Sequence, residues 1–287
     1  MNEAEAKLAL DAWDAAVARL GGKANVASLL RSAEWAKVPL AIRERAFFSA
    51  GVEDARVLQT IRSRLEAALQ GSDTSTLRDD GTPMSYSRAD AIADIRADLE
   101  AEGDSGKLTD IKSFRRQKLI QDFQIDQATS YGRYMQDVGD PEILDMYPAQ
   151  RLVRVEPRQT HRDWATRWRE AGGKVGWVGA SRTSMVALKT SPIWAALSRF
   201  GTPFPPYDFS SGMGIEDVDF ETAKGLGLVD DKYDAAQDST NGVSAFNKDV
   251  QASLRGVDQS TAAMLKTFLD GHGVGIKIDG ENVLLDS

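Results

Sequence analysis

The sequence contains no cysteine and only two histidines, His161 and His272. Without cysteine the chain has no disulfide, no thiolate nucleophile and no Cys-ligated zinc or iron–sulfur site. Two histidines leave little material for a His-rich metal site or for several acid and base groups. We therefore expect a protein without a metal or other cofactor, without catalytic residues and without enzymatic activity.

The sequence also lacks the motifs of common catalytic and nucleotide-binding sites, namely GxSxG, HExxH, the EF-hand loop and the GxxxxGKS/T phosphate loop. His161 lies near the start of an expected helix with two tryptophans, so we interpret it as a packed or hydrogen-bonding residue. His272 lies in a Gly-His-Gly turn, where we expect it to be solvated.

The segment Ser211–Gly214 resembles an anion-binding turn, but it lacks a preceding buried strand and the full GxGxxG motif. We expect a helix over 215–224 after it. The acidic residues of this stretch then belong to the first turns of that helix, where the helix dipole favours negative charge: Glu216, Asp217, Asp219 and Glu221.

Long apolar runs are absent, and no segment approaches the roughly 18–20 consecutive apolar residues that span a bilayer. The N-terminal sequence MNEAEAKLAL lacks the positive charge and apolar stretch of a secretory signal. We therefore expect no contact with a membrane and folding in the cytoplasm. With 42% hydrophobic and 27% charged residues, the composition is that of an ordinary globular protein.

Charge is distributed unevenly along the chain. The whole molecule carries −8, yet residues 151–199 hold ten basic and three acidic residues, whereas residues 201–287 hold six basic and fifteen acidic ones. Two interpretations remain open. The two segments neutralise each other within one fold, or the basic segment presents a positive face to an acidic protein surface or to DNA phosphates.

Hydrophobic periodicity and turn residues predict an α+β fold. We expect an elongated helical region over 1–146, a compact α+β module with a short antiparallel sheet over 147–230, and a C-terminal extension with a helix and a β-hairpin over 231–287. The expected helices cover 3–20, 25–31, 39–70, 87–99, 110–137, 160–171 and 259–269. The expected strands cover 152–155, 175–178, 184–188 and the hairpin at 274–285.

The stretch 191–214, SPIWAALSRFGTPFPPYDFSSGMG, combines prolines with large aromatic side chains. Proline fixes φ, and aromatic side chains bury large areas. We interpret the stretch as a stiff loop anchored in a core. A proline-rich ligand for an aromatic groove is the alternative, although such ligands are usually less aromatic.

Three segments, in order, resemble the phage Mu F-like minor head protein family. DIKSFRRQKLIQDFQIDQATSYGRYMQ (110–136) is similar to a family segment of the type RLQLIYDTNIRQAYAAGRW, and RVEPRQTHRDW (154–164) to an arginine-plus-histidine stretch. In the third segment (187–214), Ser191–Trp194 stands at the DPFW position and Pro205–Asp208 at the PPN position. The cysteine-containing close of the family is replaced by Ser-Ser-Gly-Met-Gly, and residues after about 230 lie outside the resemblance.

This resemblance implies a structural protein of a tailed bacteriophage or prophage, carried in the head interior or at the portal vertex after assembly in the host cytoplasm. The implied partners are the portal protein and the inner capsid, with packaged DNA as a further partner of the basic 151–199 segment. The residues implied to dock on a partner are Arg154, His161, Trp164, Trp194, Pro205, Pro206, Tyr207, Asp208 and Gly212.

Two rival functions remain open. One is a phage-encoded hydrolase or ADP-ribosyltransferase, which would need a cleft with a carboxylate of raised pKa beside His161 or Arg154. The other is a virion DNA-binding protein, whose affinity would fall steeply with salt.

Overall fold

The structure is a computed structural model of the chain, and it describes residues 13–26, 31, 35, 38, 43–44, 46–52, 54–71, 87–157, 162–248, 252–253, 276–279 and 282–285. The chain divides into two compact units: a first unit of residues 1–129 with 248–287, and a second unit of residues 130–247. The second unit therefore begins inside a helix, upstream of the boundary at 147 expected from the sequence, and continues beyond 230.

The first unit is mainly helical. Residues 13–21 are helical, and α4 (Ala55–Gln70), α5 (Arg88–Asp98) and the first part of α6 (Phe114–Gly139) follow. Two short strands, β1 (Ala24–Val26) and β2 (Ala46–Phe48), pair in parallel. The helices pack their apolar faces into one core that includes Trp13, Leu20, Phe47, Leu58, Ile61, Leu65, Ile95 and Ile120.

Helix ends in this unit follow local sequence signals. Asp54 caps α4 by accepting a hydrogen bond from the Arg56 amide, and Ser87 caps α5 by accepting one from the Asp90 amide. The helix expected over 87–99 is confirmed. The apolar stripe of α4 repeats at three- and four-residue spacing, which places its buried side chains on one face: Leu58, Ile61, Leu65 and Leu69.

Two helix predictions in the first unit are wrong. The long helix over 39–70 is shorter, because Phe47 belongs to β2 and Gly51 has φ +71, which is outside the helical region. The helix expected over 25–31 is replaced at its start by β1, where pairing with β2 overrides local propensity. The helix expected over 259–269 lies outside the described residues.

The C-terminal hairpin is confirmed: β7 (Ile276–Asp279) and β8 (Asn282–Leu285) pair antiparallel, and β8 also pairs with β6 (Ala252–Ser253).

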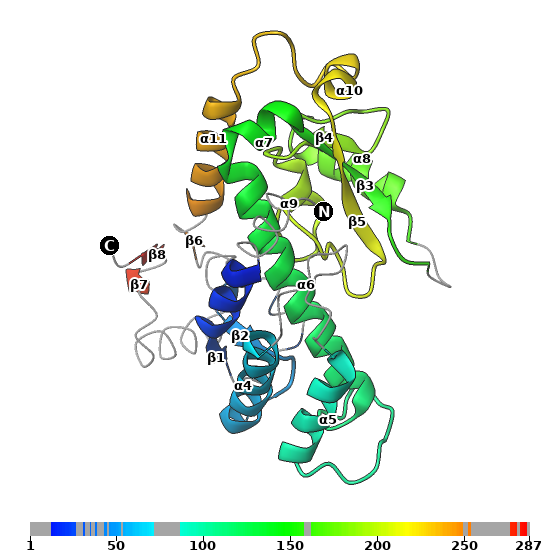
Figure 1. The fold of residues 1–287 in the computed structure, drawn as a ribbon, viewed down its shortest axis with the longest axis vertical. Helices are drawn as coiled ribbons and strands as arrows, with labels where there is room; N and C mark the ends of the chain where they lie inside the picture. The colour runs from blue at the N-terminus through cyan, green and yellow to red at the C-terminus, as the bar shows by residue number, and fades with distance from the viewer. Residues whose placement is uncertain are drawn as a thin grey trace. The chain divides into compact units, whose positions relative to one another are not determined.

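The second unit is built on a three-stranded antiparallel sheet in the order β4-β3-β5 (Figure 1). The central strand β3 (Ala149–Arg154) pairs along its whole length with β5 (Met213–Val218) and at its start with β4 (Val186–Leu188). Ala149 faces both Leu188 and Val218 across the sheet. Together with the helices, this sheet confirms the α+β class.

The helices of the second unit pack against its sheet through two apolar clusters, and a third cluster joins the end of α6 to Phe204. One joins the sheet to α8 (Trp164–Lys174) and α9 (Ile193–Leu197) through Leu152, Trp164, Trp168, Ala187, Trp194 and Tyr207. The other joins it to α10 (Phe220–Gly225) through Ala149, Val186, Val218 and Ala223. The remaining helices of the unit are α7 (Pro141–Met146), α11 (Ala235–Lys248) and the end of α6.

Two predictions in the second unit are wrong. Residues 175–178 form turns, because Gly176 and Trp177 have φ values of +65 and +62, which no strand accommodates. The helix expected over 215–224 is replaced by β5 followed by α10. Glu216 and Asp217 therefore lie on a strand, whereas Asp219 caps α10 and Glu221 lies in its first turn.

None of the helices in the described part of the chain is long and apolar enough to cross a membrane.

Candidate functional site

The proline loop, residues 198–212, connects α9 to β5 and lies against the tryptophan-rich core of the second unit. Tyr207 is fully buried and stacks on Trp194 at a centroid distance of 5.8 Å. Trp194 in turn meets Trp168 edge to face at 5.3 Å. Burial raises the pKa of Tyr207 well above its usual range. The prediction that aromatic side chains anchor this stretch in a core is confirmed for Trp194 and Tyr207.

Hydrogen bonds fix the shape of the proline loop. The amide of Arg199 donates to the carbonyl of Tyr207 at 2.9 Å, which closes the loop on itself. The hydroxyl of Thr202 donates to the carbonyl of Phe204 at 3.0 Å. Gly212 ends the loop at φ +64, and its carbonyl accepts hydrogen bonds from the amides of Val155 and Glu156 just after β3.

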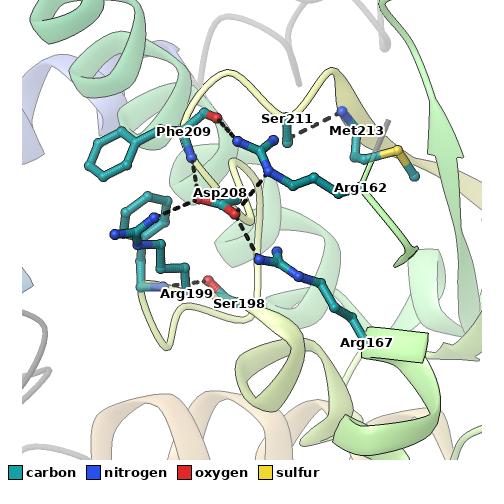
Figure 2. A network of polar contacts seen from close by, with 9 residues as sticks. Arg162, Arg167, Ser198, Arg199, Asp208, Phe209, Ser211 and Met213 are labelled. Atoms are coloured by element: carbon teal, nitrogen blue, oxygen red, sulfur yellow. Dashed lines mark hydrogen bonds and ion pairs between the residues drawn. The ribbon is translucent and has the colours of Figure 1, made fainter. Parts of the chain in front are cut away.

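Asp208 is the centre of a charged network in this loop. Only 2% of its side chain is exposed, and three guanidinium groups surround it (Figure 2). Its Oδ2 lies 2.9 Å from Arg167 Nη2 and 3.3 Å from Arg162 Nε, and its Oδ1 lies 3.4 Å from Arg199 Nη1. We call Arg162, Arg167 and Arg199 the arginine cluster.

Further contacts hold each member of the arginine cluster in place. Arg162 Nη2 donates to the carbonyl of Phe209 at 2.8 Å. Arg199 lies over the ring of Phe209, and Arg167 over the ring of Trp164, at 5.4 and 4.8 Å from the centroids. These stacking contacts and ion pairs restrict three long side chains that would otherwise be flexible.

The network carries excess positive charge. One carboxylate is surrounded by three guanidinium groups, so the cluster retains a net charge of about +2 at neutral pH, since arginine stays protonated. The side chains of Arg162, Arg167 and Arg199 are 36%, 35% and 46% exposed. The carboxylate is therefore buried while much of the positive charge reaches solvent.

A second charged cluster joins the sheet of this unit to the end of α6. Lys189, with 1% of its side chain exposed, lies 3.0 Å from Asp137 on α6 and 2.8 Å from Asp217 on β5. Burial raises the pKa of Asp137, and the nearby ammonium of Lys189 opposes that shift. This cluster connects secondary-structure elements, and both carboxylates have a cation beside them.

These contacts bear on the two interpretations of the charge pattern. Asp208, Glu216 and Asp217 come from the acidic segment, and they pair with Arg151, Lys189 and the arginine cluster of the basic segment. The two segments thus neutralise each other in part within one unit, while the arginine cluster keeps a local excess of positive charge.

The structure brings four of the nine sequence-predicted docking residues together. Trp164, Trp194 and Tyr207 share one apolar cluster, and Asp208 is bonded to the arginine cluster beside it. Four others lie away from that cluster's centre: Pro205 and Pro206 are half-buried in the loop, Arg154 is exposed at the end of β3, and Gly212 precedes β5. His161 lies outside the described residues.

Sequence reasoning missed the arginine cluster and Lys189. Asp208 was the sequence signal that could have indicated the arginines. An aspartate in a loop this apolar is expected to be buried, and a buried carboxylate needs a cation beside it. The basic excess of 151–199 supplied the candidates, but their spacing does not show which of them reach Asp208.

The enzyme alternative requires a carboxylate of raised pKa beside His161 or Arg154. Asp137 has a raised pKa, and its ion-pair partner is Lys189. Among the described residues, no group of three or more His, Asp or Glu could hold a metal ion.

A comparison of the chain with protein-family models, with curated proteins and with solved structures finds no match.

Proposed function

We propose that this chain is a minor head protein of a tailed bacteriophage or prophage, and that its second unit docks on the portal protein or the inner capsid during procapsid assembly. The proposal places the chain in the head interior or at the portal vertex of the virion, and in the host cytoplasm before assembly. Its family basis is the resemblance of three sequence segments to the Mu F-like proteins.

The observation that carries the proposal is the convergence of two of those segments on one site. Arg162 and Trp164 come from the segment 154–164, whereas Trp194, Tyr207 and Asp208 come from the segment 187–214. Arg162 bonds to both Asp208 and the carbonyl of Phe209, and the three aromatic side chains pack in one cluster. Residues that carry the resemblance therefore build one structural feature.

The geometry of the proline loop suits docking. Side chains that are already ordered lose little conformational entropy when a partner binds, so a stiff surface binds more tightly than a flexible one of the same area. Arginine and aromatic residues are enriched at the centres of protein interfaces. The loop presents both kinds of residue on a backbone fixed by internal hydrogen bonds.

The test is a deletion in the phage or prophage that encodes the chain, followed by purification of procapsids. We expect the deletion to reduce the yield of infectious particles and a plasmid copy of the wild-type chain to restore it. A Trp194→Ala copy, which removes the central core side chain of the second unit, should fail to restore it. A normal number of infectious particles that lack the chain would contradict the proposal.

A further inference from the structure

We propose that the arginine cluster is a docking site for an acidic side chain of a partner protein, with Phe200 and Phe209 forming its apolar border. The inference rests on the proposed function, because it assigns a chemistry to the partner that the second unit meets. It identifies that partner by a glutamate or aspartate that enters the cluster and by an apolar side chain next to it.

The guanidinium groups have hydrogen-bonding capacity that Asp208 does not use. Each arginine offers five N–H donors in a planar fork. Within the described part of the chain, Arg167 and Arg199 each direct one nitrogen at Asp208, while Arg162 uses two nitrogens, on Asp208 and on the carbonyl of Phe209. Those are all the hydrogen bonds and ion pairs that these guanidinium groups make with described residues. The remaining N–H groups can donate hydrogen bonds to a second carboxylate.

Asp208 organises the cluster for that ligand. Three guanidinium groups repel one another, and a buried carboxylate at their centre holds them together and fixes their orientation. Because one negative charge offsets only one of three positive charges, a second carboxylate lowers the electrostatic energy of the site further. The guanidinium groups are only partly exposed, so they have already lost part of their hydration, and guanidinium is weakly hydrated to begin with. A ligand therefore displaces little bound water when it reaches them.

The border of the site favours a protein ligand. Phe200 and Phe209 are half-exposed and meet edge to face at 4.9 Å, and Arg199 lies over Phe209. Trp164 adds a buried indole beneath Arg167, and its Nε1 has no hydrogen-bond partner among the described residues. A charged centre with aromatic neighbours matches the composition of energetically dominant interface residues.

The charge of the surrounding unit disfavours DNA. Residues 130–247 contain 13 basic and 16 acidic residues, which gives the unit a net charge of −3. DNA binding depends on many phosphate contacts along a positive surface. A single positive site on a negative unit instead suits the recognition of one or two carboxylates at a defined place.

The experiment measures binding of the purified full-length chain to a hexaglutamate peptide ending in phenylalanine, in low-salt buffer. Arg199→Gln and Arg167→Gln remove one guanidinium each and leave two on Asp208, and Arg199→Lys keeps the charge but loses the planar fork. Arg182→Gln is the matched control, because Arg182 is an exposed arginine of the same unit whose contact is the ring of Trp177. Thermal unfolding checks that each variant is folded.

We expect the two glutamine variants to lose about tenfold in affinity, the size of one charge-assisted hydrogen-bond pair. Arg199→Lys should lose part of the affinity, and the Arg182→Gln control should stay within about twofold of wild type. Equal binding by wild type and all the variants would overturn the inference. The inference would also be overturned if the same arginines bound a DNA duplex tightly and did not bind the peptide.

Incorporation into heads separates this inference from the proposed function. Suppose that the Arg199→Gln and Arg167→Gln variants enter heads to the same extent as the wild-type chain, and that neither the variants nor the wild-type chain binds the peptide. The inference then fails and the proposed function stands. If the wild-type chain never enters heads, the proposed function fails whatever the peptide does.

Discussion

Replacing Asp208 with alanine is expected to lower the stability of the second unit by about 2–4 kcal/mol. Removal of one partner from a fully buried ion pair costs about 3–5 kcal/mol, whereas exposed pairs contribute about 0–1 kcal/mol. Asp208 is buried but its three arginines are 35–46% exposed, so they recover part of their hydration once the carboxylate is gone. The estimate therefore lies between those limits, nearer the buried one.

The size of this effect can be measured by thermal unfolding followed through tryptophan fluorescence. Four of the six tryptophans lie in the second unit, so the signal reports mainly on that unit. A loss of 2–4 kcal/mol corresponds to a melting temperature lowered by roughly 6–15 °C. Added salt should restore part of the loss in the variant, because it screens the repulsion among the remaining guanidinium groups.

A matched control separates the charge network from a general effect of aspartate replacement. Asp219→Asn changes an exposed aspartate that caps α10, and asparagine caps helices as well as aspartate does. We expect it to unfold within about 0.5 kcal/mol of wild type. An Asp208→Ala variant as stable as this control would refute the reasoning that Asp208 holds the arginine cluster together.

Three further predictions concern the rest of the second unit. Gly172→Ala should destabilise it by about 1–3 kcal/mol in urea unfolding although alanine favours helices, because the new Cβ would lie 2.4 Å from the ring of Trp177; a more stable variant would contradict this packing. Lys189→Met should cost about 3–5 kcal/mol by leaving Asp137 buried without its cation, and the double variant Lys189→Met/Asp137→Leu should regain much of that loss in the same assay. Asp137 has a raised pKa in the folded state, so its contribution to stability falls as the pH rises from about 4 through that pKa. Asp137→Asn should remove this slope from a pH series of urea midpoints, and an unchanged slope would assign it to another group.

How much of the fold the sequence predicts depends on how local the signal is. The helix expected over 87–99 and the hairpin expected at 274–285 follow from local signals, and both are confirmed. Strand β5 was predicted as a helix because Glu216 and Asp217 resemble the first turn of one. Its actual conformation comes from pairing with β3, which lies about 60 residues earlier and which no local pattern reveals.

The candidate site shows the same limit. Its aromatic anchors were predictable, since Trp194 and Tyr207 belong to a short stretch rich in proline and aromatic residues. The arginine cluster was not predictable. Arg162 lies just before α8 and Arg167 lies within it, and both reach Asp208 only because that helix packs on the loop. Long-range ion pairs depend on tertiary geometry, which residue spacing does not encode.

The most direct test of the central claim is quantitative mass spectrometry of density-purified procapsids and mature heads, treated with protease from outside before lysis. The account predicts that this chain is recovered at a fixed, low ratio to the portal protein and that the shell protects it from the protease. Recovery of the chain in the soluble fraction of infected or induced cells, with none in the heads, would contradict it.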